Sequence, residues 1–451
     1  MEAILSFSWT RRDWLVLGTV LAIIFIVLIP YTFLLKGVFH DDTAYIYYPH
    51  FTFMARNIQQ GIIPLWSPNV FCGGSPFYAN YPFGALYPPL WILFDMADLS
   101  TPDSSYTGLI IVPIIFHILL SGLFAYLLGR LGLRLEYWGA AAFALVWTLS
   151  ATMYRGILDV SPLFAMGWIP GFLLFQILYT RKGNLLTLAL GGLILGFLIP
   201  SNINYVAYAV FISLVVALCL SVGSLLKRQY RVALRAIWGP AAMGVLGAML
   251  AGGYLWGVIE SVRDMAPFYP LNQPAMTAGP NSLPLRYLAT LLVPNLFSGQ
   301  DFSHVWNVVL RDQLWLSEAY LTRGFPLMFI AFISITGLWF RKGEPRGGGL
   351  RFWMFSGLSL CLLGLLLLLG RHTPFFGLLY RVCPLLRVPY ADRWHPLYTM
   401  GLAILIGTGI SGLKLSLAGR SLITFKKYLI FVTMTLVIVI AAILWPLRIG
   451  D

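Results

Sequence analysis

The chain has 451 residues, of which 59% are hydrophobic and only 10% are charged, and its formal net charge is +13. Soluble domains carry about 25% charged residues, so this composition excludes a soluble globular protein and indicates a chain that crosses a membrane many times. The positive charge lies in short segments between apolar stretches. That placement is a feature of membrane topology, and we do not interpret it as nucleic-acid binding.

Apolar stretches that are long enough to form membrane helices recur along the whole chain. We predict about eleven, at 14–35, 108–128, 137–154, 161–180, 185–200, 203–222, 236–259, 325–340, 352–370, 397–413 and 428–447. Two of them, 185–200 and 325–340, are shorter than the roughly 20 residues of a spanning helix, so the count is open by one or two. The first stretch follows Arg11 and Arg12 with no cleavage pattern after it, which indicates an uncleaved anchor with a cytoplasmic N-terminus.

The charges divide unevenly between the two sides of this predicted topology. The inner segments hold 18 basic and 4 acidic residues, whereas the outer segments hold 12 basic and 13 acidic residues. Short cytoplasmic loops of membrane proteins carry an excess of Lys and Arg, so the division supports the orientation. The predicted location is therefore a multi-pass position in a membrane, with the N-terminus in the cytoplasm.

Most of the polar sequence falls in three outer segments, 36–107, 260–324 and 371–396. The first contains a Tyr-rich amphipathic run from Tyr45 to Gln60, so amphipathic helices are expected within this loop. The predicted fold is all-α and polytopic. Residues 1–451 are expected to form a single integral-membrane domain with no separate soluble domain.

Two adjacent carboxylates, Asp41 and Asp42, stand where the chain leaves the first apolar stretch. Transfer of a group to a hydroxyl needs a base that removes the proton, and a positioned carboxylate contributes typically 10²–10⁴-fold to such a reaction. A neighbouring carboxylate raises its partner's pKa, or the pair holds a divalent cation through oxygen ligands. The alternative is structural, with Asp42 as the N-cap of a helix that begins at Thr43. No metal site is assigned, and both roles of the pair stay open.

Arginines of the outer segments are candidates for binding a lipid phosphate. The guanidinium group matches phosphate oxygens, and fixed cations stabilise the charge of a phosphate leaving group. The residues considered are Arg155, Arg263, Arg371, Arg381, Arg387 and Arg393. From these we select Arg155, Arg263, Arg387 and Arg393 as the donor-phosphate set. The alternatives are a loop network between Arg393 and Asp392, or arginines that bond lipid headgroups.

Aromatic residues are abundant in the first outer segment, and Trp66, Tyr78 and Tyr81 are the candidates for lining a substrate site. Aromatic side chains at a membrane interface also anchor a protein in the membrane, and we expect this role for most of the aromatic residues in the segment.

His117 is the one ionisable residue placed well inside a predicted span, and a neutral, hydrogen-bonded His is favoured over a functional one. Cys219 and Cys361 are expected to be small apolar residues within spans. Spacing alone does not establish a disulfide between the other two cysteines.

Short motifs occur in a fixed order along nearly the whole chain. They are Asp42 with Tyr47-Tyr48-Pro49, Gly61-Ile62-Ile63-Pro64-Leu65-Trp66, Gly73-Gly74-Ser75-Pro76, Tyr87-Pro88-Pro89, Trp168-Ile169-Pro170, Val293-Pro294-Asn295-Leu296-Phe297, and Leu385-Leu386-Arg387-Val388-Pro389-Tyr390-Ala391-Asp392-Arg393. Taken together they resemble the YfhO-like bacterial membrane proteins, which are part of the GT-C superfamily of polyprenyl-phosphate-dependent glycosyltransferases.

The resemblance implies an all-helical GT-C architecture with the active site at the extracytoplasmic surface of a bacterial cytoplasmic membrane. It also implies an acidic motif in the first outer loop, where Asp41 and Asp42 stand, and a donor sugar carried on a polyprenyl phosphate. The chain differs from larger relatives in stopping soon after its last apolar stretch, with no outer soluble domain.

The leading hypothesis is a membrane glycosyltransferase that moves a sugar from a polyprenyl-phosphate donor to an extracytoplasmic glycan, lipid or polymer. One alternative is a non-catalytic GT-C-like subunit of a larger complex, with partner subunits. Another is a transporter of a lipid-linked sugar, and the nearly charge-free spans and the lack of matched broken helices count against it. The expected partners are the lipid-linked donor and membrane lipids, with no nucleic acid.

Overall fold

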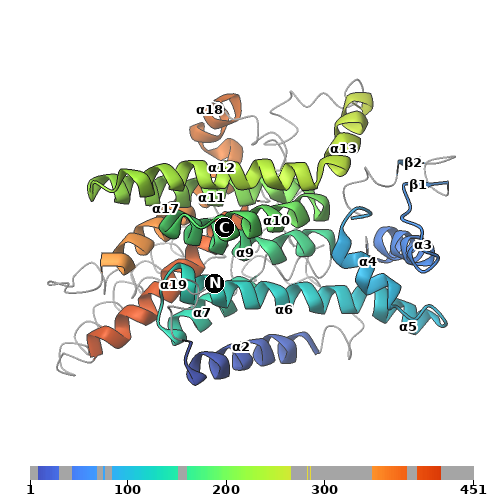
Figure 1. Ribbon diagram of the computed structural model, residues 1–451, viewed down its shortest axis with the longest axis horizontal. Helices are drawn as coiled ribbons and strands as arrows, with labels where there is room; N and C mark the ends of the chain where they lie inside the picture. Colours follow the sequence, from blue (N-terminus) through green and yellow to red (C-terminus); the bar gives the residue numbers. More distant parts are fainter. Residues whose placement is uncertain are drawn as a thin grey trace, which may run out of the picture.

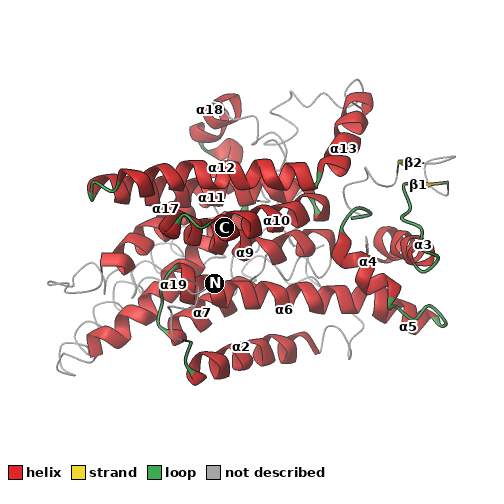
Figure 2. Cartoon of the chain, viewed as in Figure 1, coloured by secondary structure: helices red, strands yellow, loops and turns green. Residues whose placement is uncertain are grey.

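The computed structural model describes residues 9–29, 43–68, 75–76, 84–150, 160–265, 282, 285, 348–382 and 394–417, and these are almost entirely helical (Figure 2). The α-helices in them are α2 (Arg11–Ile29), α3 (Tyr48–Ile58), α4 (Pro88–Asp95), α5 (Pro102–Tyr106), α6 (Val112–Leu127), α7 (Tyr137–Thr148), α9 (Val160–Lys182), α10 (Leu185–Ser201), α11 (Ile203–Leu226), α12 (Tyr230–Leu250), α13 (Gly252–Met265), α17 (Gly348–Leu368), α18 (Pro374–Val382) and α19 (His395–Leu417). Short π-helical turns are η2 (Thr43–Tyr47), η4 (Thr107–Ile111) and η5 (Leu128–Gly132), and η9 (Gly370–His372) is a 3-10 turn.

A single small pairing of strands accompanies the helices in the described ranges. It joins β1 (Trp66–Ser67) and β2 (Ser75–Pro76) as an antiparallel pair, with Trp66 opposite Pro76 and Ser67 opposite Ser75. Two residues a side do not make a layer of the fold. The prediction of an all-α protein is therefore confirmed.

Six helices of the described part are long and apolar enough to cross a membrane. They are Arg11–Ile29, Pro102–Gly132, Val160–Lys182, Ile203–Leu226, Tyr230–Leu250 and Gly349–Leu368. The stretch Leu185–Ser201 is a shorter apolar helix, as its length in the sequence indicated. The predicted spans 325–340 and 428–447 lie outside the described residues, so the total of about eleven stays a prediction.

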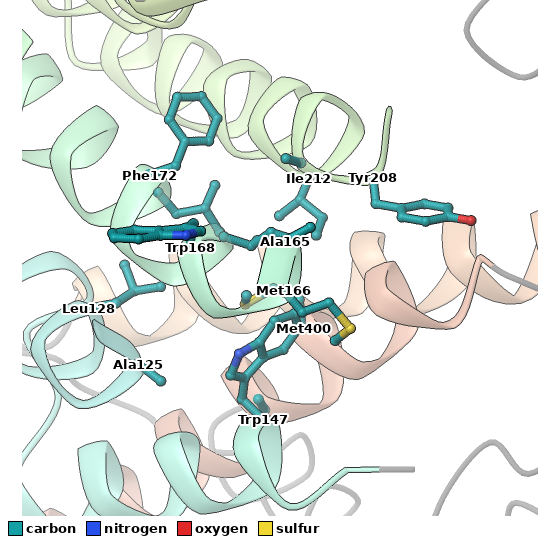
Figure 3. Packing of buried hydrophobic residues seen from close by; sticks show 14 of the residues in the cluster. Ala125, Leu128, Trp147, Ala165, Met166, Trp168, Phe172, Tyr208, Ile212 and Met400 are labelled. Carbon is teal, nitrogen blue, oxygen red and sulfur yellow. The ribbon is translucent and has the colours of Figure 1, made fainter. Parts of the chain in front are cut away.

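The spans form an antiparallel bundle around α9, which is almost completely buried (Figure 1). Helix α9 packs against α6, α10, α11 and α12, while α19 packs against α17 and α7. Figure 3 shows side chains of several of these helices meeting in one cluster around Ala165, Met166 and Trp168. Helices α2 and α12 lie at the periphery and keep many of their apolar side chains exposed, as expected of surfaces that face lipid.

Helices α17 and α19 approach so closely that their backbones touch at glycines. A Cβ atom on Gly401 would lie 2.5 Å from the carbonyl oxygen of Gly357 and 2.6 Å from the amide nitrogen of Cys361. Small residues allow membrane helices to approach in this way, because association there depends on van der Waals contact and not on water exclusion. The contact fixes α19 and thereby the position of Trp394 just before it.

Two predicted spans differ from the structure. For the stretch 137–154 the structure gives α7, Tyr137–Thr148, which has 12 residues and is shorter than the roughly 20 of a spanning helix. The stretch 236–259 was predicted as a single helix, whereas α12 begins earlier at Tyr230 and ends at Leu250, and α13 starts at Gly252. The break falls at Ala251-Gly252-Gly253, where glycine weakens a helix. Beyond it, α13 buries Tyr254 and exposes Glu260 and Arg263, so it is amphipathic and not a continuation of the span.

The two ends of the helix bundle differ in their charged residues. At the first, Arg130 Nε donates to Asp13 Oδ1 over 2.6 Å, and Arg181 Nη1 donates to the carbonyl oxygen of Leu131 over 3.2 Å. The Asp13 carboxylate is 1% exposed, and Arg130 also donates to the carbonyl oxygen of Leu135. We call this the basic end. Its described Lys and Arg residues are Arg11, Arg12, Arg130, Arg134, Arg181, Lys182, Lys227, Arg228, Arg231, Arg235 and Arg351, against the acids Asp13 and Glu136.

The opposite end carries η2, α3, α4, α5, β1, β2 and α13, and we call it the loop-rich end, whereas α18 projects from the side of the bundle (Figure 1). Gln59 Nε2 donates to the carbonyl oxygens of Phe94 and Ala97, which ties α3 to α4. The described charged residues there are Arg56, Arg263, Asp95, Asp98, Asp103 and Glu260, so this end has no excess of positive charge. The uneven division of charge seen in the sequence is thus a division between the two ends of the bundle.

Candidate functional site

The predicted site residues fall mostly outside the described part of the chain. Seven of them lie there: Asp41, Asp42, Tyr78, Tyr81, Arg155, Arg387 and Arg393. The two that are described, Trp66 in β1 and Arg263 in α13, are both exposed at the loop-rich end, Trp66 by 56%. The candidate site is therefore built from the described residues that adjoin the predicted ones.

The chain is anchored immediately after Asp42. Thr43 is buried and begins the π-helical turn η2, which leads into α3. The ring of Tyr47 lies 5.8 Å from that of Phe51, and Phe51 lies 5.2 Å from Phe94 of α4. The helical turn begins at Thr43, one residue after Asp42, and the role of Asp42 as base or cap stays a prediction because Asp42 lies outside the described residues.

A second anchor stands immediately after Arg393. Trp394 is fully buried, and its ring packs edge-on against Tyr208 and Phe211 of α11 at centroid distances of 5.0 and 4.9 Å. Its indole Nε1 has no hydrogen-bond partner among the residues that the structure describes. The side chain therefore holds the start of α19 against the first turns of α11.

A buried chain of hydrogen bonds underlies the first outer segment. Trp168 Nε1 donates to the Tyr87 hydroxyl over 2.5 Å, and that hydroxyl lies 2.7 Å from His117 Nε2. His117 Nδ1 lies 2.7 Å from the carbonyl oxygen of Pro113, which only accepts, so Nδ1 carries the proton and Nε2 accepts from Tyr87. Burial raises the pKa of the Tyr87 phenol far above its ordinary value, so it stays a donor.

This network confirms the favoured interpretation of His117 as a neutral, hydrogen-bonded residue, and it adds a partner that the sequence did not indicate. Tyr87 comes from the first outer segment, at the N-cap of α4, and not from a neighbouring span. Its motif Tyr87-Pro88-Pro89 and the motif at Trp168 were each visible in the sequence. Their pairing was not, because it depends on the loop folding back into the bundle.

The first turns of α9 connect the two anchors. The ring of Phe164 lies 6.2 Å from Phe51 of α3 and 4.3 Å from His117. Three residues earlier, Ser161 Oγ accepts from Asn202 Nδ2 over 2.7 Å. Asn202 caps α11, on which Tyr208 meets Trp394.

These contacts form a continuous floor at the loop-rich end, running from α3 through α9 to α11. It joins the residue after Asp42 to the residue after Arg393. We call it the floor, and define it by Phe51, Ser161, Phe164, Asn202 and Tyr208.

Metal binding has no support within the described ranges, where no group of three or more His, Cys, Asp or Glu side chains could hold an ion. The suggested cation site at Asp41 and Asp42 lies outside those ranges and stays a prediction. Ser161, Asn202 and the Tyr87 network are neutral donors and acceptors, so the floor itself offers support and hydrogen bonds but no charge.

Comparison with known proteins yields one similar solved structure and no matching family. The chain matches no family model, and it matches no curated protein. Among solved structures it is similar to the archaeal oligosaccharyltransferase AglB from Archaeoglobus fulgidus in complex with an inhibitory peptide and a dolichol-phosphate. The TM-score is 0.48 and the identity 12%, over 97% of this chain and 55% of that one, so the chain spans about half the length of AglB. A likeness of this size establishes neither a shared activity nor a shared ligand.

Proposed function

We propose that the chain is a membrane glycosyltransferase that moves a sugar from a polyprenyl-phosphate donor to an acceptor outside the cytoplasm. The observation that carries the proposal is the floor. It connects Thr43, next to Asp42, with Trp394, next to Arg393, at one end of a bundle of apolar helices. A lipid-linked substrate needs an arrangement of this kind, with polar groups at a membrane surface and apolar surface below for the lipid tail.

In this proposal the acceptor hydroxyl gives its proton to Asp42 as its oxygen forms a bond to the anomeric carbon of the donor sugar. The bond between that carbon and the phosphate oxygen breaks, and the polyprenyl phosphate leaves with the bonding electrons. Arg387 and Arg393 bind the phosphate that gains charge, and Arg155 and Arg263 add to the positive field. Asp41 raises the pKa of Asp42, or shares a divalent cation with it.

Orientation and location belong to the same proposal. The basic end faces the cytoplasm and the loop-rich end faces outward, as short basic loops require. The membrane is the cytoplasmic membrane of a bacterium, which is where the sequence resemblance places such proteins. Trp66, Tyr78 and Tyr81 then line the route by which sugar or isoprenoid approaches.

The test is a transfer assay in proteoliposomes with a polyprenyl-phosphate hexose and a mixture of lipid and oligosaccharide acceptors. Asp42→Asn should lower turnover by roughly 10²–10⁴-fold while binding of the donor lipid is retained. Asp41→Asn should have a smaller effect unless chelation of divalent cations also abolishes turnover. A matched control is Asp98→Asn, an exposed carboxylate at the loop-rich end whose described contacts are to Ser100 and Ser104.

Two results separate the enzyme from a non-catalytic subunit. A subunit would copurify with partner proteins, would retain no donor lipid, and would be indifferent to Asp42→Asn. Wild-type turnover of Asp42→Asn, with intact donor binding, would reduce Asp42 to a helix cap and overturn its role as base.

A further inference from the structure

Three arginines lie near the end of α9, at the basic end of the bundle. Arg181 is in the last turn of α9, and its Nη1 donates to the carbonyl oxygen of Leu131 over 3.2 Å. Arg134 follows η5 and is exposed, and its charge lies within electrostatic range of Arg181. Arg235 of α12 packs its guanidinium over Gly183, where a Cβ atom would lie 2.5 Å from the Arg235 Cζ atom. We call Arg134, Arg181 and Arg235 the arginine cluster.

The arginine cluster has no carboxylate partner in the described part of the chain. Asp13 pairs with Arg130, and neither Asp13 nor Glu136 forms an ion pair with a member of the cluster. The ends of α9 and of the helix Pro102–Gly132 each supply roughly half a negative elementary charge. Two such ends offset about one positive charge, so the cluster keeps a charge of roughly +2. It therefore attracts an anion.

The donors of the arginine cluster suit a phosphate group. A guanidinium has five N–H donors, and Arg181 uses one of its own in the bond to Leu131. The guanidinium groups of Arg134 and Arg235 form no hydrogen bond with the described residues. Phosphate oxygens accept pairs of parallel N–H bonds from arginine, which a single chloride ion or a water molecule does not match.

Exposed aromatic residues indicate that the arginine cluster lies at the level of lipid headgroups. Trp238 is 68% exposed and lies one helical turn, about 4.5 Å, beyond Arg235 along α12. Trp14 and Trp138 are also exposed, in the first turns of α2 and α7, which start at the basic end. Tryptophan is enriched at the interface between membrane and water. Helix α12 lies on the outside of the bundle (Figure 1), so lipid reaches Arg235 from the side.

We propose that the arginine cluster binds the phosphate of an anionic phospholipid in the leaflet at the basic end. Basic sites between membrane helices bind such headgroups. The acyl chains then lie deeper along α10 and α12, where Leu193 and Val245 are exposed. A soluble phosphate would gain the charge contacts but not these apolar ones. The proposal does not rest on the proposed transfer reaction or on which side of the membrane faces outward.

The experiment uses the full chain, purified in dodecyl maltoside and stripped of copurifying lipid. Dioleoyl phosphatidylglycerol is titrated in, bound lipid is counted by native mass spectrometry, and the apparent Kd of the first bound lipid is derived. Dioleoyl phosphatidylcholine, with the same acyl chains and no net charge, is titrated in parallel. Inorganic phosphate serves as the competitor. We expect tighter binding of phosphatidylglycerol than of phosphatidylcholine, and no displacement by an equal concentration of inorganic phosphate.

The double variant Arg134→Gln with Arg235→Gln should raise the apparent Kd for phosphatidylglycerol by about tenfold or more, because each cation near a headgroup contributes roughly a factor of five. Neither side chain has a described hydrogen bond, so the fold should be retained. The matched control is Arg11→Gln with Arg12→Gln, which removes two exposed cations from the same end and should leave the Kd unchanged.

A second variant, Arg181→Lys, tests the geometry of the arginine cluster apart from its charge. Lysine keeps the positive charge but lacks the bidentate fork, so the Kd for phosphatidylglycerol should rise while that for phosphatidylcholine stays the same. This variant carries the test by itself if the double variant does not fold.

Three outcomes would overturn the proposal. Equal Kd values for the cluster variants and the control would show that the lipid responds to the general charge of this end. Equal binding of phosphatidylcholine would show that the site does not select anionic lipid. Displacement of phosphatidylglycerol by an equal concentration of inorganic phosphate would identify a site for free phosphate. Transfer activity does not enter these readouts, so a failure of the proposed function leaves them unaffected.

Discussion

The phenolic oxygen of Tyr87 lies 2.7 Å from Nε2 of His117, inside the bundle and 30 positions away in the sequence. Both side chains are fully buried, and Trp168 donates to the same hydroxyl. The hydroxyl therefore satisfies two groups that would otherwise lack a partner in an apolar interior. It is the link that holds the start of α4 to two spans, and through α4 it positions the first outer segment.

Tyr87→Phe should destabilise the protein although it removes only one oxygen atom. It leaves Trp168 Nε1 and His117 Nε2 buried without a partner, and each unsatisfied group costs about 1–3 kcal/mol. The midpoint of thermal unfolding in detergent should fall accordingly. Tyr45→Phe is the matched control, because Tyr45 is 81% exposed and its hydroxyl removal should have little effect. Equal midpoints for the two variants would show that the network contributes nothing.

Apolar stretches predicted most of the described fold, because burial in lipid requires continuous apolar helices whatever their packing. The predicted stretches 161–180 and 203–222 correspond to α9 at Val160–Lys182 and α11 at Ile203–Leu226. The break between α12 and α13 was missed, because the apolar residues of α13 extend the hydrophobic pattern past the point where the helix becomes amphipathic. Its exposed face follows from tertiary structure and not from composition.

The candidate site was less predictable for a related reason. His117 and Tyr87 were each noticeable in the sequence, yet their contact depends on a loop that returns into the bundle. The floor depends on Ser161 and Asn202, ordinary polar residues at the ends of spans that carry no motif of their own. The carboxylates and arginines remain predictions, and the described anchors at Thr43 and Trp394 are what connects them to the fold.

Gly401→Ala should disrupt the contact between α17 and α19. The added methyl would lie 2.5 Å from the carbonyl oxygen of Gly357, a backbone atom that cannot rotate away. Overpacking of this kind costs typically about 1–3 kcal/mol, which a denaturation curve in detergent should resolve. Gly244→Ala in α12 is the control. No atom lies within 4 Å of its Cβ position, so the better helix propensity of Ala should leave stability equal or raise it by up to about 1 kcal/mol.

Arg130→Leu should be strongly destabilising, because it leaves the Asp13 carboxylate, 1% exposed, without its cation. Removing one partner of a buried ion pair costs about 3–5 kcal/mol. Adding Asp13→Asn to that variant should restore part of the stability, since the buried charge is then gone. The exposed Arg12→Gln is the charge-matched control. If the double variant is no more stable than Arg130→Leu, the unpaired charge of Asp13 is not the cause of the lost stability.

Acidification should weaken the packing of α3 through His50. Desolvation lowers the pKa of His50 below its ordinary value of 6.5, against an opposing contact of Nδ1 with the carbonyl oxygen of Ile46 at 2.6 Å. A lowered pKa means that the unfolded chain binds the proton more readily, so this contribution to stability is present at pH above 6.5 and declines as the pH falls below it. Unfolding midpoints of the wild type and His50→Gln should therefore converge on acidification. A constant difference between them from neutral to acid pH would contradict the assignment.

The last prediction concerns the two sides of the membrane. Within the described residues the basic end holds eleven Lys and Arg residues and two acids, while the loop-rich end holds two Arg residues and four acids. The positive-inside rule then predicts that Asp42, Arg263 and Arg393 all face outward. Single cysteines at these positions should react with a membrane-impermeant maleimide in intact cells, whereas a cysteine at Arg228, in the turn between α11 and α12, should react only after permeabilisation. Arg228 suits the control because it is exposed.

Protection of all three outer positions together with labelling at 228 in intact cells would show that the topology is the reverse of the one predicted. It would also move the proposed site to the cytoplasmic side, where a flipped lipid donor could not reach it. Labelling at 263 but not at 42 and 393 would show that Arg263 lies on the opposite side of the membrane from Asp42 and Arg393. Arg263 could then not belong to the same site as those two residues.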